Sequence, residues 1–297
     1  MPASTGPFPQ GLQHIVRENE PLGPLTWLKI GGPARYFAEP TTENELIQVV
    51  RACHTNNIPL RVIGGGSNLL IREAGFDGAV LSIAAADFSS IAIDGNRIRC
   101  GSGAKLSHLV TRSVGAGLSG LEHLVGIPGT VGGALHGNSG TLNGDIGQRV
   151  ISARLLRNDG TLIELAGEKL HFSTRKSSLD ELVILDCLFE LEPSNTAALT
   201  SRMQTQWIVK RAGQPSSSFA AAIPFVDPVT ASAAELIERS GMRGALEGPV
   251  QLSLTFPNFL VAGPSATSDQ VLALIERVRS AVYKQTGVQL QLHLKIW

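Results

Sequence analysis

Residues 62–71 read Val-Ile-Gly-Gly-Gly-Ser-Asn-Leu-Leu-Ile, so three consecutive glycines follow directly on a short apolar run. We expect a strand at 60–63 that ends in a turn at 64–68. Consecutive glycines let backbone N–H groups approach an anion without interference from a Cβ, and Ser67 and Asn68 add side-chain donors. The turn is not a Gly-x-Gly-x-x-Gly fingerprint, because Leu69 takes the third glycine position counted from Gly64, and no Gly-Lys-Ser/Thr follows. Alone, it leaves a structural and an anion-binding interpretation open.

A second segment, residues 126–147, reads Gly-Ile-Pro-Gly-Thr-Val-Gly-Gly-Ala-Leu-His-Gly-Asn-Ser-Gly-Thr-Leu-Asn-Gly-Asp-Ile-Gly. Its eight glycines would be costly in backbone entropy unless a ligand or a closely packed backbone required them. The apolar residues among them, Ile127, Pro128, Val131 and Ala134, would be unusual in a solvated linker. Two such segments suggest a long cofactor with a pyrophosphate, held by one loop at the pyrophosphate and by the other along its remaining length.

The composition narrows the classes of protein that remain. A chain of 297 residues has room for two domains, and its 25 basic and 25 acidic side chains leave no net field that would attract nucleic acid or an anionic membrane. Three scattered cysteines and histidines without HExxH spacing argue against a disulfide framework or a metal site. No signal peptide and no apolar stretch long enough to span a membrane are visible. We therefore expect a cytoplasmic protein with no metal, no membrane insertion and no nucleic-acid partner.

Hydrophobic periodicity predicts a mixed α+β chain. We expect helices at 42–56, 104–116, 197–211, 231–240 and 268–285, strands at 60–63, 79–83, 97–100 and 183–191, and a hairpin at 154–165. Thr267 and Gln270 are placed as a capping box for the last helix, and Gly287 lies just past its end. Alternating apolar and polar residues predict a final strand over 288–297, with His293 on its polar face.

Further motifs accompany the glycine-rich segments: Thr26-Trp-Leu-Lys-Ile-Gly-Gly-Pro-Ala34, Ser119-Gly-Leu-Glu122, Lys210-Arg211 and Gln214-Pro215. With them the chain resembles, over nearly its whole length, the UDP-N-acetylenolpyruvoylglucosamine reductases, in the wider vanillyl-alcohol-oxidase type of FAD fold. The resemblance implies a two-part FAD-binding domain at 12–191 and a smaller α+β substrate-side domain at 197–297. It also implies NADPH as reductant, a UDP-sugar as small-molecule ligand and a role in peptidoglycan synthesis. Some relatives attach flavin through a histidine near the first loop, where this chain has Asn68, so we expect non-covalent FAD.

The resemblance also assigns the cofactor contacts. The pyrophosphate is expected at residues 64–68, and the flavin and ribityl chain along the second segment. The full set of expected FAD contacts is Ile63, Gly64, Gly65, Gly66, Ser67, Asn68, Leu69, Gly126, Ile127, Pro128, Gly129, Thr130, Gly132, Gly133, Ala134, Asn138, Gly140 and Ile146.

The catalytic residues of the family are only partly present. Phe172-Ser-Thr-Arg-Lys-Ser177 matches a Tyr-Arg-x-Ser motif and retains Arg175. Ala222-Ile-Pro-Phe-Val-Asp-Pro228 matches Gly-Ser-x-Phe-Lys-Asn-Pro, with Ile223 at the serine position, and His293 takes the place of a glutamate. Isoleucine cannot donate a proton, so we expect the family reaction to be impaired or altered. His293 is open to two interpretations, a replacement acid or a solvated side chain.

Two classes of function therefore remain. The chain is a diverged flavin-dependent reductase that acts on a UDP-sugar or a related enol ether, or it is a non-catalytic FAD-binding paralogue with a regulatory or scaffolding role. An oxidase of the wider fold with another substrate is a third, weaker possibility. The sequence identifies no protein partner.

Overall fold

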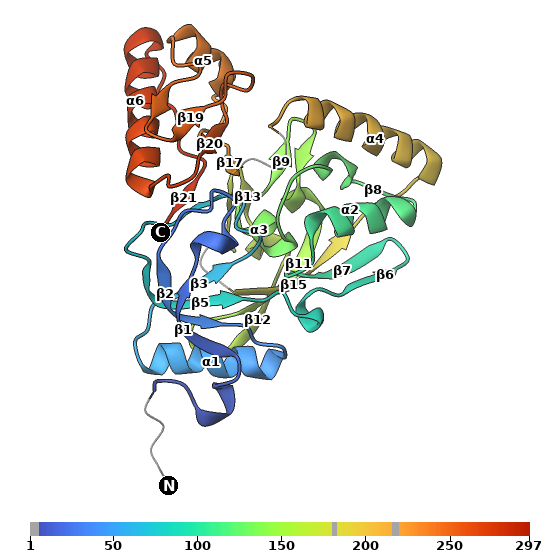
Figure 1. Cartoon of the computed structure of the whole chain (residues 1–297). Helices are drawn as coiled ribbons and strands as arrows, with labels where there is room; N and C mark the ends of the chain where they lie inside the picture. Colours follow the sequence, from blue (N-terminus) through green and yellow to red (C-terminus); the bar gives the residue numbers. More distant parts are fainter. Residues whose placement is uncertain (1–5, 180–182, 216–219) are drawn as a thin grey trace. The chain divides into compact units, whose positions relative to one another are not determined.

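The computed structural model describes residues 6–179, 183–215 and 220–297 (Figure 1). The chain divides into two compact units. The first contains Met1–Glu18, Tyr36–Gly65 and Gly78–Lys210, and the second contains Asn19–Arg35, Gly66–Asp77 and Arg211–Trp297. The predicted domains, 12–191 and 197–297, differ from these units because each unit is assembled from three separate stretches of chain.

The first unit is built around a five-stranded antiparallel sheet in the order β12-β11-β15-β7-β6. Its strands are β6 (Ile91–Asp94), β7 (Arg97–Gly101), β11 (Val150–Leu156), β12 (Leu162–Ala166) and β15 (Val183–Glu190). Helix α3 (Val131–His136) packs against β7 and β15, and α2 (Leu106–Gly115) packs against α3. Buried side chains of these elements form one core cluster, which includes Ile98, Leu109, Leu135 and Phe189. The second glycine-rich segment is therefore anchored in the core of this unit.

A four-stranded sheet in the order β1-β2-β5-β3 leads to the first glycine loop. Its strands are β1 (Val16–Pro21), β2 (Pro33–Ala38), β3 (Leu60–Ile63) and β5 (Phe76–Ser82), and β3 and β5 are parallel. Three of these strands, β1, β2 and β5, begin in one unit and end in the other. Helix α1 (Glu43–Thr55) contributes Leu46, Val49 and Val50 to a separate buried cluster with Leu81.

The second unit combines a small antiparallel sheet with two helices. The sheet has the order β17-β20-β19-β18, with β17 (Ala220–Ala222), β18 (Leu246–Glu247), β19 (Val250–Leu252) and β20 (Leu260–Ala262). Helix α5 (Ala233–Arg239) packs against α6 (Ser268–Thr286), and α6 also packs against β18 and β19. Strand β21 (Lys295–Ile296) pairs in parallel with β4 (Leu69–Leu70). Leu28, Ile30 and Leu70 share the core of this unit with α6, so early and late parts of the chain fold together.

Short pairs of strands and one long helix complete the described part of the chain. The pairs are β8 (Leu118–Ser119) with β16 (Glu192–Pro193), β9 (Gly140–Thr141) with β10 (Gly144–Asp145), and β13 (Phe172–Ser173) with β14 (Lys176–Ser177). Helix α4 (Thr196–Ala212) buries only Leu199 fully. Single-turn 3-10 helices, η4 (Glu122–Leu124) and η5 (Ile146–Arg149), flank the second glycine-rich segment, and η1 (Gln10–Leu12), η2 (Gly23–Leu25), η3 (Ala86–Phe88) and η6 (Gly167–Lys169) occur elsewhere.

The predicted elements are confirmed where local signals were strong. Helix α6 has its capping box at Thr267 and Gln270 and ends at the left-handed Gly287. The hairpin β11–β12 turns at Gly160. The predicted strand over 288–297 is wrong for most of its length, because only Lys295–Ile296 joins a sheet. Leu292 adds an isolated antiparallel bridge to Phe225, and burial of Leu290 and Leu294 against the core of the second unit accounts for the alternating pattern outside any ladder.

Candidate functional site

The two glycine-rich loops touch one another in the first unit. A Cβ on Gly64 would lie 2.6 Å from Oγ1 of Thr130, and a Cβ on Gly65 would lie 2.8 Å from Cα of Gly129. Both distances are too short for a side chain: backbone packing requires glycine at position 65, and at position 64 a Cβ would displace the hydroxyl of Thr130. The structure thus brings together two segments that the sequence separates by some 60 positions, counted from Gly65 to Gly129.

Backbone hydrogen bonds hold the second loop in place. The N–H of Leu106 donates to the carbonyl of Gly129 at 3.1 Å, and the N–H of Val131 donates to the carbonyl of Ala104 at 2.9 Å. The Thr130 side chain caps α3 by accepting from the N–H of Gly133 at 3.3 Å. Hydrogen bonds to Ala104 and Leu106 and at the N-terminus of α3 therefore fix the position of this loop.

Both loops carry backbone donors that the protein itself does not use. Within residues 6–179, 183–215 and 220–297, the N–H groups of Gly65, Gly66, Ser67, Gly129 and Thr130 have no acceptor. Unpaired backbone donors are uncommon in folded proteins unless water or a ligand accepts from them. The three donors that belong to the first unit, on Gly65, Gly129 and Thr130, suit an anionic ligand such as a pyrophosphate. The first loop passes from one unit to the other between Gly65 and Gly66.

Several residues predicted to contact FAD are buried and make contacts within the chain. Asn138 is 3% exposed. Its Nδ2 donates to the carbonyl of Ser173 at 2.9 Å, and its Oδ1 accepts from the N–H of Gly147 at 3.1 Å. Ala134 and Ile146 belong to the core of the first unit. The amide of Asn138 therefore connects the second glycine-rich segment to the β13–β14 hairpin.

That hairpin carries Arg175 at its turn. Arg175 is exposed and has φ of +61°, a left-handed backbone that costs a non-glycine residue about 1–2 kcal/mol. Ser177, on β14, donates its hydroxyl to the carbonyl of His136 at 3.1 Å. Two side-chain hydrogen bonds, from Asn138 and Ser177, thus fix the Arg175 turn beside the end of α3.

The second unit brings together the positions of Ile223 and His293. The N–H of His293 donates to the carbonyl of Pro224 at 2.8 Å, and the N–H of Val226 donates to the carbonyl of Gln291 at 3.0 Å. Ile223 is 38% exposed, whereas His293 is half-buried and does not lie on the polar face of a regular strand. The solvated-strand interpretation of His293 therefore loses its structural basis.

Asn68 has a contact that the sequence did not indicate. Its Nδ2 donates to the carbonyl of His293 at 3.0 Å, and its own carbonyl accepts from the N–H of Lys295 at 3.0 Å. The amide was expected at the FAD pyrophosphate. In the structure it ties the first glycine loop to the segment that carries His293.

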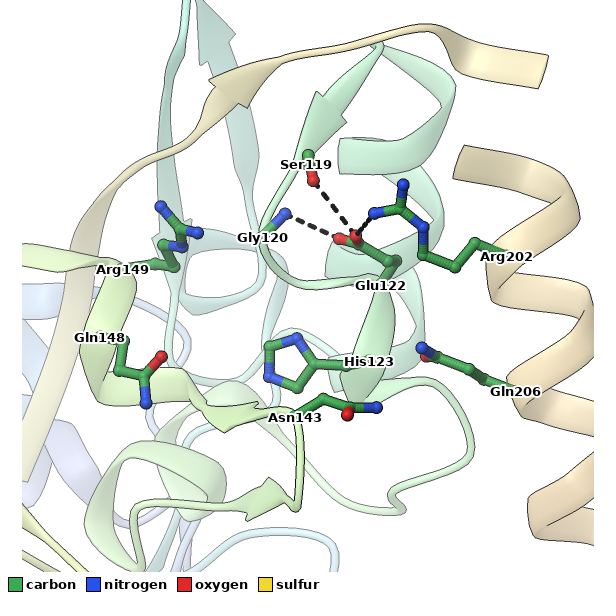
Figure 2. Close-up of a pocket in the computed structure, with 9 residues that line it drawn as sticks. All are labelled: Ser119, Gly120, Glu122, His123, Asn143, Gln148, Arg149, Arg202 and Gln206. Carbon is green, nitrogen blue, oxygen red and sulfur yellow. Dashed lines mark hydrogen bonds and ion pairs between the residues drawn. The ribbon is translucent and has the colours of Figure 1, made fainter. Parts of the chain in front are cut away.

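A polar cavity of about 410 Å³ lies in the first unit, and sequence reasoning missed it (Figure 2). At its wall the buried carboxylate of Glu122 accepts from the N–H of Gly120 at 2.7 Å, from Ser119 at 3.1 Å and from Arg202 at 2.9 Å. Burial raises the pKa of this carboxyl, but these donors outweigh burial and the net pKa is lowered. Glu122 is therefore an ionised group inside the protein.

Lys210, near the end of α4, holds the start of the second loop. Its Nζ donates to the carbonyls of His123 at 2.9 Å and Val125 at 2.7 Å, just before Gly126. Burial lowers the pKa of the Lys210 ammonium to about 8. Lys210 belongs to a motif in the sequence, but nothing in the sequence indicated that it meets the two residues, His123 and Val125, that precede the second loop.

Metal-binding clusters and membrane-spanning helices are both absent from the described part of the chain. No group of three His, Cys, Asp or Glu side chains there is arranged to hold a metal ion. None of the helices described is long and apolar enough to cross a membrane.

Comparisons with known proteins cover both units. Residues 34–166 match the model of the FAD binding domain, and residues 214–297 match that of the UDP-N-acetylenolpyruvoylglucosamine reductase, C-terminal domain. The chain is 47% identical over 290 residues to the UDP-N-acetylenolpyruvoylglucosamine reductase of Rhodopirellula baltica, covering 98% of this chain and 95% of that protein. It is 36% identical over 284 residues to the corresponding reductase 2 of Symbiobacterium thermophilum, covering 95% and 92%.

A solved structure agrees over the same extent. The crystal structure of UDP-N-acetylenolpyruvylglucosamine reductase from Thermus caldophilus superposes with a TM-score of 0.82 at 32% identity, covering 95% of this chain and 99% of that chain. These matches confirm the predicted α+β class and FAD as the cofactor.

Proposed function

Because the chain belongs to the UDP-N-acetylenolpyruvoylglucosamine reductase family, we propose that it uses FAD to reduce the enolpyruvyl ether of a UDP-sugar, with slow proton delivery. The reaction would supply UDP-N-acetylmuramate for peptidoglycan. When bound, FAD supplies the chemistry of hydride transfer from NADPH to the enolpyruvyl carbon. The protein must hold the cofactor, stabilise the negative charge that develops on the substrate and provide a proton.

We assign the cofactor to the two glycine loops. The observation that carries this assignment is the set of first-unit backbone N–H groups on Gly65, Gly129 and Thr130, which have no acceptor among the described residues. Side-chain groups around them are engaged within the protein, as Asn68 and Asn138 are, and we give these two residues a positioning role. No histidine occurs in residues 62–71, which agrees with non-covalent attachment.

On the substrate side, we assign charge stabilisation to Arg175. Its guanidinium remains protonated at any physiological pH and can bind a carboxylate or an enolate oxygen through two N–H groups. A left-handed backbone at an exposed arginine is a strained arrangement of the kind that concentrates at functional sites. The attachment of its turn to α3 through Asn138 and Ser177 supports this role.

Proton delivery is the slow step of the proposed reaction. Ile223 offers an aliphatic side chain where the family has a serine hydroxyl, and the loss of a positioned acid costs about 10²–10⁴-fold in rate. His293 is the titratable group whose backbone lies beside this position, through its hydrogen bond to Pro224. We propose His293 as the substitute donor, since a histidine titrates near neutral pH.

Stopped-flow absorbance of the flavin separates the two half-reactions. NADPH should bleach the FAD absorbance of the purified protein, and the enolpyruvyl UDP-sugar should restore it at least ~10²-fold more slowly than in an intact relative. An Ile223→Ser, His293→Glu double variant should speed this second phase. Ile223→Val is the matched control, because it changes volume without adding a hydroxyl, and it should leave the second phase unchanged.

The same experiment identifies the alternative function. Steady-state turnover of the unmodified protein near ~10 s⁻¹, a typical enzyme rate, would refute slow proton delivery. A yellow protein that NADPH cannot reduce would instead be a non-catalytic FAD-binding paralogue.

A further inference from the structure

The polar cavity of the first unit is distinct from the residues assigned to FAD. It is lined by Ser119, Gly120, Glu122, His123, Asn143, Gln148, Arg149, Arg202 and Gln206. These residues come from β8, η4, the β9–β10 turn, η5 and α4, and none of them belongs to the set assigned to the cofactor. Figure 2 shows the imidazole of His123 extending from η4 into the middle of this space, toward Gln148.

The charged groups at the cavity already have partners. Glu122 is paired with Arg202 at 2.9 Å, and Arg149 is paired with Glu192 at 2.6 Å. These four side chains carry two positive and two negative charges. Glu192 lies outside the lining, but each of the two arginines of the cavity already has a carboxylate partner, so an entering phosphate or carboxylate would have to compete with Glu122 or Glu192 for an arginine.

Neutral polar atoms, by contrast, are left without partners. Nε2 of His123 and Oε1 of Gln206 are buried and make no hydrogen bond within the described residues. His123 is only 9% exposed. Burial lowers the pKa of its imidazole, and Arg149 and Lys210 act in the same direction, whereas Glu122 and Asp145 oppose them. His123 is consequently neutral at pH 7, and its ring offers one donor and one acceptor.

We propose that this cavity binds an uncharged sugar. Hydroxyl groups both donate and accept, so one ring can satisfy Nε2 of His123 and Oε1 of Gln206 together. The amides of Asn143 and Gln148 add further neutral donors and acceptors; Figure 2 shows Gln148 across the cavity from Gln206 and Asn143 beside His123. A volume of about 410 Å³ corresponds to roughly a dozen water molecules at ~30 Å³ each, which is room for a monosaccharide.

The test uses the full-length protein with FAD bound, with D-glucose and N-acetyl-D-glucosamine as probes. Saturation-transfer NMR and calorimetry should show saturable binding that persists in the presence of excess UDP-N-acetylmuramate, which occupies the proposed reductase site. Gln206→Leu and His123→Leu should each weaken binding about threefold to tenfold, as expected for the loss of one neutral hydrogen bond. Gln204→Leu, on the exposed face of the same helix, is the matched control and should leave the affinity unchanged.

Flavin absorbance and thermal unfolding establish whether each variant is folded, and a poorly folded His123→Leu leaves Gln206→Leu as the decisive variant. Saturable binding of acetate or phosphate in place of the sugars would refute an uncharged ligand. Absence of sugar binding, displacement by UDP-N-acetylmuramate, or an affinity that Gln206→Leu does not change would overturn the proposal.

Discussion

Replacement of Gly65 by alanine tests whether the contact between the two glycine loops is needed to bind FAD. The new Cβ would lie 2.8 Å from Cα of Gly129. Ordinary contacts between carbon atoms are about 3.5–4.0 Å, so one loop has to move by roughly 0.7–1.2 Å. Both sides of the contact are backbone, and neither can be relieved by a change of rotamer.

The structure sets the size of the expected effect. Overpacking of this kind costs about 1–3 kcal/mol of folding free energy. A shift of this length also moves the N–H groups of Gly65 and Gly129 away from a bound anion. Loss of two hydrogen bonds worth about 1 kcal/mol each corresponds to roughly a thirtyfold weaker dissociation constant for FAD.

Two measurements separate packing from cofactor binding. Thermal unfolding of the apoprotein should shift down by about 2–4 °C per kcal/mol, and titration of the apoprotein with FAD should show the weaker affinity. The cofactor is removed for both by acid, which releases non-covalent flavin. Gly115→Ala is the matched control, because a Cβ there meets nothing within 4 Å. It should raise the unfolding temperature slightly or leave it unchanged, and it should not change FAD affinity.

If Gly65→Ala keeps the FAD affinity and stability of the unmodified protein, the loops do not touch as described. If Gly65→Ala lowers stability without changing FAD affinity, the two loops do touch, but the N–H groups of Gly65 and Gly129 do not bind the cofactor.

Two further predictions concern the cavity wall. Glu122→Ala should lower the free energy of unfolding by about 1–3 kcal/mol, since the buried N–H of Gly120 loses its acceptor. Glu192→Ala is the control, because the carboxylate of its ion pair is 69% exposed. It should lower the free energy of unfolding by at most about 1 kcal/mol in the same denaturant titration. Equal losses would contradict this account. In the folded protein the pKa of His123 is lowered from 6.5. When the pH falls below 6.5, the unfolded chain therefore binds a proton at this histidine more readily than the folded chain does, which favours unfolding. Stability should therefore fall from pH 7.5 to pH 5.5 and fall less in His123→Asn; an equal fall in both proteins would exclude His123 as a source.

The sequence predicted best those elements whose signals lie within a few residues of one another. The capping box of α6 and the glycine after it are local, and both are found where expected. The strand predicted at the end of the chain failed because alternation reports burial and not pairing. Leu290 and Leu294 are buried in the core that includes α6, whereas pairing in this segment is limited to a bridge between Leu292 and Phe225 and to Lys295–Ile296.

The site was predictable in its glycine loops and not in the contacts between them. Gly65 and Gly129 lie in two segments that each suggested a ligand, but only the fold shows that one glycine makes room for the other. The cavity at His123 was missed for a related reason. Glu122 and Arg202 are 80 positions apart, and a pair so distant leaves no pattern in a single sequence.

The assembly of the second unit from separate stretches of chain has a consequence for the order of events during synthesis. The side chain of Asn68 donates a hydrogen bond to the carbonyl of His293, 225 positions later in the chain. Asn68 therefore leaves the ribosome long before its partner is made. Until then β4 has no partner and Leu70 has no core to enter. Closing so long a loop is slow because its entropic cost precedes the contacts that offset it. The nascent chain must therefore keep an unpaired strand and exposed apolar side chains from aggregating for most of its synthesis.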